Sequence, residues 1–415
     1  RKLLLIAGII LNLACLCYYK YTNFILINAV GALKFCGDTA HLQAASSLRA
    51  PALDIILPLG ISFFVFEFIH YLVDVYRGSK PVRSWLEFAA FTAFFPSQIA
   101  GPIKRYQEFV ENLRKPLPWS SALFNEAMTL IVQGMFKKIA IADPLGWVIN
   151  NSYTSLVPIS STDALLAFFG FSIQIFCDFS GYTDIGRGSA LLLGIRLPPN
   201  FALPYIAEDI ALFWRKWHMS LSLWIRDYVY IPLGGSRGSS LSNMRNLFIT
   251  MAVCGLWHGA AWQFVLWGCL HGTALIINRQ WCQLVKSSSF LTSLSTRLPV
   301  RIFNAALTFL FVAAAFVMFR APDLGTTWNI FSSLANFGAE SRTVEYLDKS
   351  GVLIFALVYL SFWLLSEALK KIRRIESSQA IIYPLPLRLA SWTAAVLIMI
   401  AAKPTLATPF IYFQF

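Results

Sequence analysis

The sequence predicts an all-α protein that crosses a membrane many times, and two observations carry this prediction. Hydrophobic residues make up 57% of the 415 residues and charged residues 13%, whereas a soluble chain carries about 25% charged residues. The apolar residues lie in long continuous runs that are typical of membrane helices, not in the alternating pattern of outer-membrane barrel strands. Together they exclude a soluble multidomain protein, a disordered chain, a coiled coil and a disulfide-stapled scaffold.

Uncharged runs mark the expected membrane segments in order along the chain. These runs are residues 3–19, 55–66, 88–103, 164–177, 246–278, 303–319, 351–366 and 389–402. A weaker run, 127–148, has Lys137 and Lys138 near its middle, and further helices are expected around Leu191 and over residues 212–233. The pattern predicts a single membrane domain over residues 1–415 with about nine to eleven transmembrane or re-entrant helices, each span needing ~20 residues.

Two of these runs are expected to break. The run 88–103 contains Pro96 and Pro102, and proline removes a helical hydrogen bond, so a broken or re-entrant helix is predicted there. The run 246–278 is 33 residues long, which exceeds the ~20 residues of one span. We therefore expect the chain to turn or re-enter within it.

The beginning of the chain is expected to be a membrane segment. Arg1 and Lys2 precede the run 3–19 as they would in a signal peptide, but no small-residue cleavage site follows. Instead the aromatic and basic residues 18–21 lead into a second apolar run, 24–33. Because the first residue is Arg1 and not Met, a truncated start is expected.

The basic residues indicate topology. The chain has 34 Lys and Arg against 21 Asp and Glu, a formal net charge of +13. These residues flank apolar spans and contact membrane lipids, so no nucleic-acid partner is predicted. By the positive-inside rule, the basic loop at residues 77–83 and the one at residues 370–374 are predicted to lie in the cytoplasm, and residues 38–50 outside it.

Neither disulfides nor a metal site are predicted. Most of the seven cysteines lie inside apolar runs, namely Cys15, Cys17, Cys177, Cys254 and Cys269, and are expected to be small buried hydrophobes. Cys254 and His258, four residues apart, share a helical face, as two ligands of one metal ion can. Glu67 and His70 form one Glu-x-x-His pair, but a di-iron bundle needs two.

Ionisable residues gather between residues 177 and 271. They are Asp178, Asp184, Arg187, Arg215, Lys216, His218, Arg226 and Asp227. A charge at membrane depth costs several kcal/mol unless it is paired or lines a wet cavity, so the cluster predicts a polar cavity inside the membrane. The alternative is that individual charges lie at the membrane interface within a belt of Trp and Tyr.

Two histidines in this region are candidate catalysts. His258 follows Trp257 in an uncharged run, where a histidine is more often packed than catalytic. Burial nevertheless favours the neutral imidazole, which can accept a proton. The adjacent Gly259 would let a substrate approach the backbone, and Ser220 could orient His218. The glycine-rich stretch 234–238 is expected to be a turn.

At these residues the chain resembles the membrane-bound O-acyltransferase family, and within it the bacterial branch that contains the alginate O-acetyltransferase membrane subunit. The segments that carry the resemblance occur in the family's order. They are LPLGISFFVFEFIHYLVDVYRG (57–78), FFPSQIAGPIKRYQEF (94–109), FCDFSGYTDIGRGSALLLGIRLPPNF (176–201), FWRKWHMSLSLWIRDYVYIPLGGSRG (213–238) and RNLFITMAVCGLWHGAAWQFVLWGCLHG (245–272).

The resemblance implies a helical bundle around a central tunnel in the inner membrane of a bacterium. The family's invariant histidine matches His258 and its second histidine matches His218. No cofactor is bound; a thioester, acetyl-coenzyme A or an acyl-carrier thioester, is the donor substrate on the cytoplasmic side. The acetyl group passes to a periplasmic acetyltransferase of the SGNH-hydrolase type, which works with the exopolysaccharide machinery to modify alginate or a similar polymer.

Other readings stay open at this point. The D-alanyl branch of the family modifies teichoic acid from a carrier-protein thioester, although residues 231–238 favour the alginate-type branch. Relatives carry further helices before the run 3–19, and residues 67–70 are more charged here than is common, which leaves the acceptor polymer open. A transporter for a polysaccharide or lipid-linked sugar, and a scaffold that only anchors a periplasmic transferase, are the rivals from other classes.

The mechanistic hypothesis gives His258 the role of general base on the acceptor hydroxyl, with a covalent acyl-histidine as the variant. Oxyanion donors are expected from Trp257, Asn246 or Arg226, and His218 would position a substrate. Four basic residues are candidates for the phosphates of coenzyme A, namely Arg215, Lys216, Lys104 and Arg105. The remaining candidates for the tunnel wall are Ser220, Asp227, Asp178 and Gln98.

Overall fold

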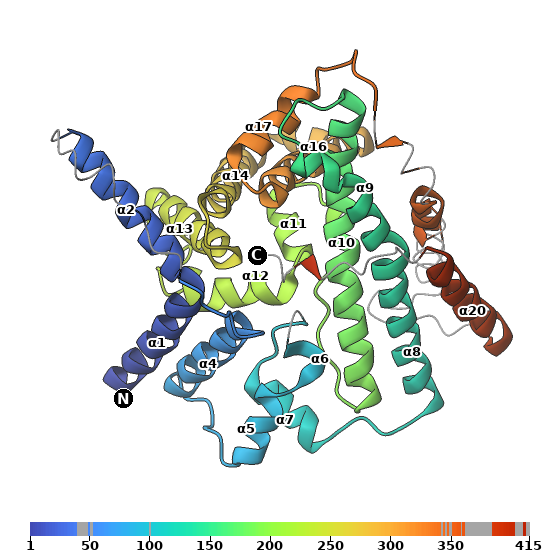
Figure 1. Cartoon of the computed structure of the whole chain (residues 1–415). Helices are drawn as coiled ribbons and strands as arrows, with labels where there is room; N and C mark the ends of the chain where they lie inside the picture. Colours follow the sequence, from blue (N-terminus) through green and yellow to red (C-terminus); the bar gives the residue numbers. More distant parts are fainter. Residues whose placement is uncertain are drawn as a thin grey trace.

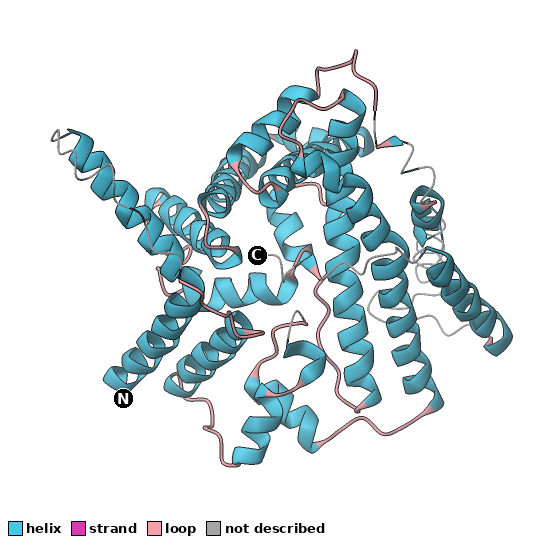
Figure 2. Cartoon of the chain, viewed as in Figure 1, coloured by secondary structure: helices cyan, strands magenta, loops and turns pink. Residues whose placement is uncertain are grey.

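The computed structural model describes residues 1–39, 49, 53–98, 101–341, 343–344, 347, 351–357, 359–361, 384–402 and 410–411. Every regular element in this part of the chain is a helix (Figure 2), so the all-α prediction is confirmed. Four of the described helices are long and apolar enough to cross a membrane, namely Lys2–Cys36, Ser161–Leu192, Leu298–Arg320 and Leu385–Ala402. The total of nine to eleven membrane segments stays a prediction.

The N-terminal helix is continuous but bent. It comprises α1 (Lys2–Leu16), the π-helical segment η1 (Cys17–Tyr21) and α2 (Thr22–Thr39), and it changes direction at η1 (Figure 1). A π-turn is one of the few common causes of a helix bend. Leu16 and Tyr21, on either side of this bend, are buried, so the helix meets the rest of the molecule most closely at its midpoint.

The predicted break in the run 88–103 is confirmed. After α4 (Ile61–Tyr76), the chain forms the short helices α5 (Trp85–Thr92), α6 (Phe95–Gln98) and α7 (Tyr106–Arg114). No single helix spans this run, and its residues 99 and 100 lie outside the described part. The short helices surround a small separate core that includes Phe91 and Phe109.

The weaker run 127–148 lies within one bent rod. It consists of α8 (Ser121–Phe136), the π-helical η2 (Lys137–Ala142) and α9 (Asp143–Thr154). Both lysines of η2 reach α10 (Ser161–Leu192): Lys137 pairs with Asp184, and the Lys138 ammonium lies 2.6 Å from Asp178. The pairing offsets the cost of two charges inside an apolar layer. The helix expected around Leu191 is the end of α10 and not a separate element.

The predicted helix over residues 212–233 is broken into pieces. The chain forms η3 (Pro204–Ile206), α11 (Ile210–Lys216), α12 (Met219–Ile225) and η4 (Arg226–Tyr230). The break between α11 and α12 falls at His218, whose backbone is left-handed (φ 42°, ψ 54°). The turn expected at residues 234–238 is confirmed, with positive φ at Gly234 and Gly235.

The long run 246–278 turns, as predicted. It belongs to the helical hairpin of α13 (Ser240–His258) and α14 (Trp262–Ser287). Two glycines let these helices approach closely: a Cβ atom on Gly255 would lie 2.1 Å from the Phe264 carbonyl oxygen, and one on Gly268 would lie 2.2 Å from the Met251 carbonyl oxygen. Small residues at such crossings are typical of membrane helix pairs.

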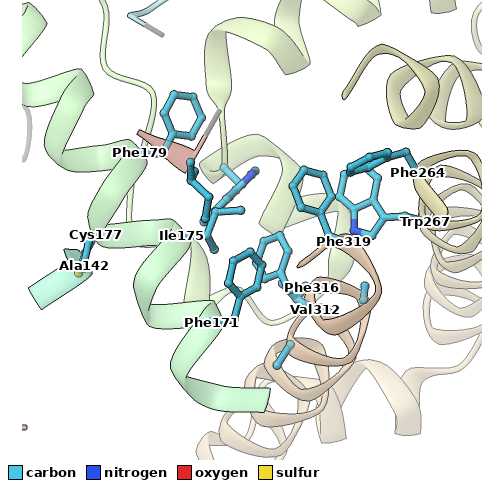
Figure 3. Packing of buried hydrophobic residues seen from close by; sticks show 14 of the residues in the cluster. Ala142, Phe171, Ile175, Cys177, Phe179, Phe264, Trp267, Val312, Phe316 and Phe319 are labelled. Atoms are coloured by element: carbon cyan, nitrogen blue, oxygen red, sulfur yellow. The ribbon is translucent and has the colours of Figure 1, made fainter. Parts of the chain in front are cut away.

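The main core contains side chains of α10, α14 and α16 (Leu298–Arg320), together with side chains of α4, α9, α11, α12 and α13. Figure 3 shows Phe171 and Ile175 of α10 facing Phe316 of α16, with Phe319 beside Trp267 of α14. The remaining described helices are α15 (Ser289–Ser295), α17 (Leu324–Ser333) and α20 (Leu385–Ala402).

Some predictions fall on residues that the structure does not describe. They concern the basic loop at 370–374 and most of both the loop 38–50 and the end of the run 351–366. The cytoplasmic side of the protein and the extent of one domain over residues 1–415 stay predictions.

All seven cysteines lie among the described residues, and no disulfide joins any two of them there. Cys177 and Cys254 are buried as expected, but Cys15 and Cys17 are exposed on the N-terminal helix. That helix presents most of its apolar side chains outward, and so these two thiols do too.

Candidate functional site

His258 lies inside a box of aromatic rings. It is the last residue of α13 and is 7% exposed. Its ring centroid lies 4.8 Å from that of Trp257, 5.2 Å from Trp267 and 5.1 Å from Phe319. The latter two residues come from α14 and α16, so three helices position this imidazole.

Gly259 follows the last residue of α13 in an extended conformation, and no larger residue fits there. A Cβ atom at this position would lie 2.1 Å from the ring of Phe264. The Phe264 ring fills the space that a side chain at this position would take, and the approach of a substrate to the Gly259 backbone stays a prediction.

His218 lies near the same indole ring as His258. Its own ring is 1% exposed, with the centroid 4.6 Å from that of Phe179 and 6.4 Å from that of Trp257. The tertiary structure therefore gives the two histidines a shared neighbour, Trp257, although 40 residues separate them in the sequence.

Ser220 does not orient His218 through its hydroxyl. Its Oγ donates to Asn200 Oδ1 over 2.7 Å and accepts a hydrogen bond from the backbone N–H of Ile103 over 3.0 Å. Asn200 Oδ1 also accepts from the Ser220 N–H over 3.2 Å. Asn200 is fully buried and holds the first turn of α12, next to His218. Sequence reasoning missed it, although it follows two prolines in one of the family-like segments.

The end of α13 is held by the N-terminal helix. Lys20 Nζ donates to the carbonyl oxygen of Trp257 over 2.7 Å and to that of His258 over 3.0 Å. The Tyr21 hydroxyl donates to the carbonyl oxygen of Leu256 over 2.8 Å. Sequence reasoning gave these residues no role, and a lone cation between two apolar runs was the signal that could have found them.

Of the three expected oxyanion donors, the structure places only Trp257 beside His258. Asn246 lies twelve residues earlier on the same helix, about 18 Å along its axis, and donates to the Gly235 carbonyl oxygen over 3.1 Å. The Arg226 guanidinium is exposed and donates to Asp227 over 2.7 Å.

Two buried indole N–H groups flank His258. Neither Trp257 Nε1 nor Trp267 Nε1 has a hydrogen-bond acceptor within the described residues. A buried donor without an acceptor costs about 1–3 kcal/mol, and a catalytic role is one of the explanations for such a group in a native protein. Trp267 was not among the residues singled out from the sequence.

The expected phosphate-binding residues do not form one site. Lys104 is buried and paired with Glu67, and Arg105 pairs with Asp227. Arg215 is exposed on α11 and borders a pocket of about 260 Å³ that Asp209, Asn278 and Arg279 also line. The structure shows Lys216 half-buried next to Arg215.

Asp178 anchors the described C-terminal residues. It accepts a hydrogen bond from the Ile411 N–H over 2.8 Å, besides its ion pair with Lys138. The ring centroid of Phe410 lies 4.7 Å from Tyr182. These contacts place residues 410 and 411 beside α10, whose position Figure 1 shows. Gln98, the last residue of α6, is half-buried.

The side chains of Glu67 and His70 both bond to other groups of the fold. Besides the Glu67–Lys104 pair, His70 Nε2 accepts a hydrogen bond from the Tyr106 N–H over 3.3 Å, so its Nδ1–H donates to the Phe66 carbonyl oxygen over 3.1 Å. Within the described residues, no group of three or more His, Cys, Asp or Glu side chains could hold a metal ion.

Comparison with known proteins gives the family. A model of the membrane-bound O-acyltransferase family matches residues 79–319, which include both candidate histidines. A probable alginate O-acetylase from Azotobacter vinelandii is 38% identical over 83% of this chain and 64% of its own length. A peptidoglycan O-acetyltransferase from Helicobacter pylori is 33% identical over 87% of this chain and 71% of its own length.

A more distant similarity extends to a teichoic acid D-alanyltransferase from Bacillus subtilis, 29% identical over 54% of this chain and 60% of its own length. The chain spans less than two thirds of the Azotobacter relative that it matches. The family match covers more than half of the chain, and it agrees with the all-helical fold and the long apolar helices. The chain is a multi-pass membrane protein that belongs to the membrane-bound O-acyltransferase family.

Proposed function

We propose that this protein is an O-acyltransferase that moves an acetyl group from a thioester donor toward hydroxyl groups of an extracellular polysaccharide. The observation that carries the proposal is the surrounding of His258: a buried imidazole with two buried indole N–H groups beside it, those of Trp257 and Trp267. The names of the relatives, alginate and peptidoglycan O-acetyltransferases, support the same chemistry.

The arrangement supports acyl transfer as follows. The neutral His258 imidazole removes the proton from the acceptor hydroxyl, whose oxygen attacks the thioester carbonyl carbon. The indole N–H groups donate hydrogen bonds to the oxygen that becomes negative. The tetrahedral intermediate collapses, the carbon–sulfur bond breaks, and the leaving thiolate takes the proton back from His258. In the alternative route, the His258 imidazole itself attacks the thioester carbonyl carbon and the carbon–sulfur bond breaks, which leaves an acyl-histidine and a thiolate. The acceptor hydroxyl then attacks the acyl carbon, the carbon–nitrogen bond breaks, and the hydroxyl proton passes through the freed imidazole to the thiolate.

Donor, acceptor and location are finer parts of the proposal. We infer acetyl-coenzyme A as donor, a bacterial inner membrane as location and a periplasmic acetyltransferase as the partner that receives the acetyl group. An alginate-like polymer is favoured by the 38% identity to the Azotobacter relative. Peptidoglycan is the second candidate acceptor, because the Helicobacter relative aligns with 87% of this chain.

The test uses membrane vesicles that contain the protein and its periplasmic partner. Labelled acetyl-coenzyme A, or a labelled acyl-carrier thioester, is supplied on the cytoplasmic side, and label in each candidate polymer is counted. Wild type and a His41→Ala control, which the proposal gives no role, should transfer label, whereas His258→Ala should transfer none at equal protein amounts.

Each rival predicts a different result. A scaffold that only anchors the periplasmic transferase would keep wild-type transfer in His258→Ala. A transporter would move substrate across the vesicle membrane without transferring any acyl group from a donor to an acceptor. Either result contradicts the proposed function, while transfer from the carrier thioester alone would correct the donor.

A further inference from the structure

His258 is the last residue of α13, and helix ends carry unsatisfied backbone groups. The last four carbonyl oxygens of a helix have no partner within it. In α13 these belong to residues 255–258, and the extended backbone of Gly259 (φ −160°) prevents another helical turn. Inside a membrane no water is available to bond such a carbonyl, so leaving it unsatisfied is costly.

Three of these four carbonyls are satisfied by two consecutive side chains of the N-terminal helix. The Lys20 ammonium donates hydrogen bonds to the carbonyl oxygens of Trp257 and His258, and the Tyr21 hydroxyl donates one to the carbonyl oxygen of Leu256. Both side chains come from the π-helical residues 17–21, where the N-terminal helix bends (Figure 1).

Lys20 is a basic residue on a helix whose exposed side chains are mostly apolar. Such a residue is costly at membrane depth unless it has a partner. Its partners here are the carbonyls of a helix C-terminus, where the helix dipole favours a positive charge. The ammonium also lies 5.9 Å from the centroid of the Trp257 ring.

We propose that Lys20, assisted by Tyr21, is a positioning residue for the transfer reaction: it fixes the last turn of α13 and so holds the His258 imidazole and the Trp257 indole in place. The inference rests on the proposed function of His258. A terminal helical turn frays unless its backbone is held, and a misplacement of a catalytic group by ~1 Å can cost 10²-fold in rate.

The test compares variants that differ in the hydrogen bonds they can make. Lys20→Met keeps the length of the side chain but cannot donate, whereas Lys20→Arg keeps the charge and the donors. Lys34→Met removes a cation from α2 on the same continuous helix, away from η1, and is the matched control. Tyr21→Phe removes only the hydroxyl that serves Leu256.

We expect Lys20→Met to lower kcat for acetyl transfer roughly 10- to 100-fold with KM for the donor nearly unchanged. Lys20→Arg should recover most of the rate, Tyr21→Phe should lose less than Lys20→Met, and Lys34→Met should equal wild type. The rates are measured per folded protein in reconstituted vesicles with the partner. A purely structural role would reduce the folded amount and leave kcat alone.

A failure of this inference can be distinguished from a failure of the proposed function. A wild type that transfers label, a His258→Ala that does not and a Lys20→Met with wild-type kcat would overturn the inference alone. No transfer by wild type from either donor would overturn the proposed function and the inference with it. Should Lys20→Met not fold, a wild-type kcat in Tyr21→Phe together with a wild-type kcat in a folded Lys20→Leu, which also lacks a donor, would overturn the inference.

Discussion

The Trp257 indole has both candidate histidines as neighbours, with its ring centroid 4.8 Å from that of His258 and 6.4 Å from that of His218. Phe66 stacks on the same indole, with the two ring centroids 4.9 Å apart and an interplanar angle of 19°. One ring therefore packs the α13 terminus against α4 and presents an N–H group that lacks an acceptor within the described residues.

Two substitutions of Trp257 separate the packing of its ring from hydrogen-bond donation by its N–H group. Trp257→Phe keeps a ring against Phe66 but removes the N–H, and we expect a loss of roughly 10²-fold in transfer rate with little change in thermal stability. Trp257→Ala also removes the packing and should lower the free energy of unfolding by about 3–5 kcal/mol. Rates in vesicles and unfolding midpoints in detergent check both, and wild-type transfer by Trp257→Phe would exclude the indole N–H as an oxyanion donor.

His218 combines a left-handed backbone with a buried ring, and two variants separate these properties. A left-handed non-glycine residue costs roughly 1–2 kcal/mol, and glycine avoids this cost. His218→Gly and His218→Ala lose the same contact with Phe179, so we expect the glycine variant to unfold at the higher temperature while both transfer acetyl more slowly than wild type. Equal unfolding midpoints would show that the backbone at residue 218 relaxes without the imidazole.

The contact between Gly259 and Phe264 can be tested with a double-mutant cycle. Gly259→Ala places a methyl group against the Phe264 ring, and overpacking of this kind costs typically about 1–3 kcal/mol. Because the ring is the obstacle, adding Phe264→Leu should recover part of the stability lost in Gly259→Ala. Thermal unfolding in detergent gives the coupling energy; an additive pair would mean that the methyl group finds another space.

The buried pair of Glu67 and Lys104 is expected to be structural. Glu67→Gln leaves the lysine charge buried without its partner, which typically costs about 3–5 kcal/mol. The double variant Glu67→Gln with Lys104→Met removes both charges and should regain much of the stability. Glu87→Gln, at the exposed pair with Arg114, is the control and should leave the unfolding midpoint unchanged. A Glu67→Gln as stable as the control would contradict a buried ion pair.

The sequence alone determined the class of the protein and two of the places where its helices break, but not the break at His218. Long uncharged runs exclude a water-soluble fold because so many apolar side chains cannot be buried in one, and the prolines near residue 96 and the excess length of the run 246–278 predicted breaks that the structure contains. The family resemblance and the two histidine motifs were also readable, since they are local patterns.

The tertiary structure decided which of these residues meet. Asn246, Arg226 and Lys104 are as suggestive in the sequence as Trp257, yet their polar atoms bond elsewhere. Lys20 donates to the backbone of His258 across 238 residues of sequence, and Trp267 reaches the same imidazole from another helix. Helix periodicity fixes the face on which a side chain lies but not the neighbour that this face packs against, because that choice depends on how all the helices fit together.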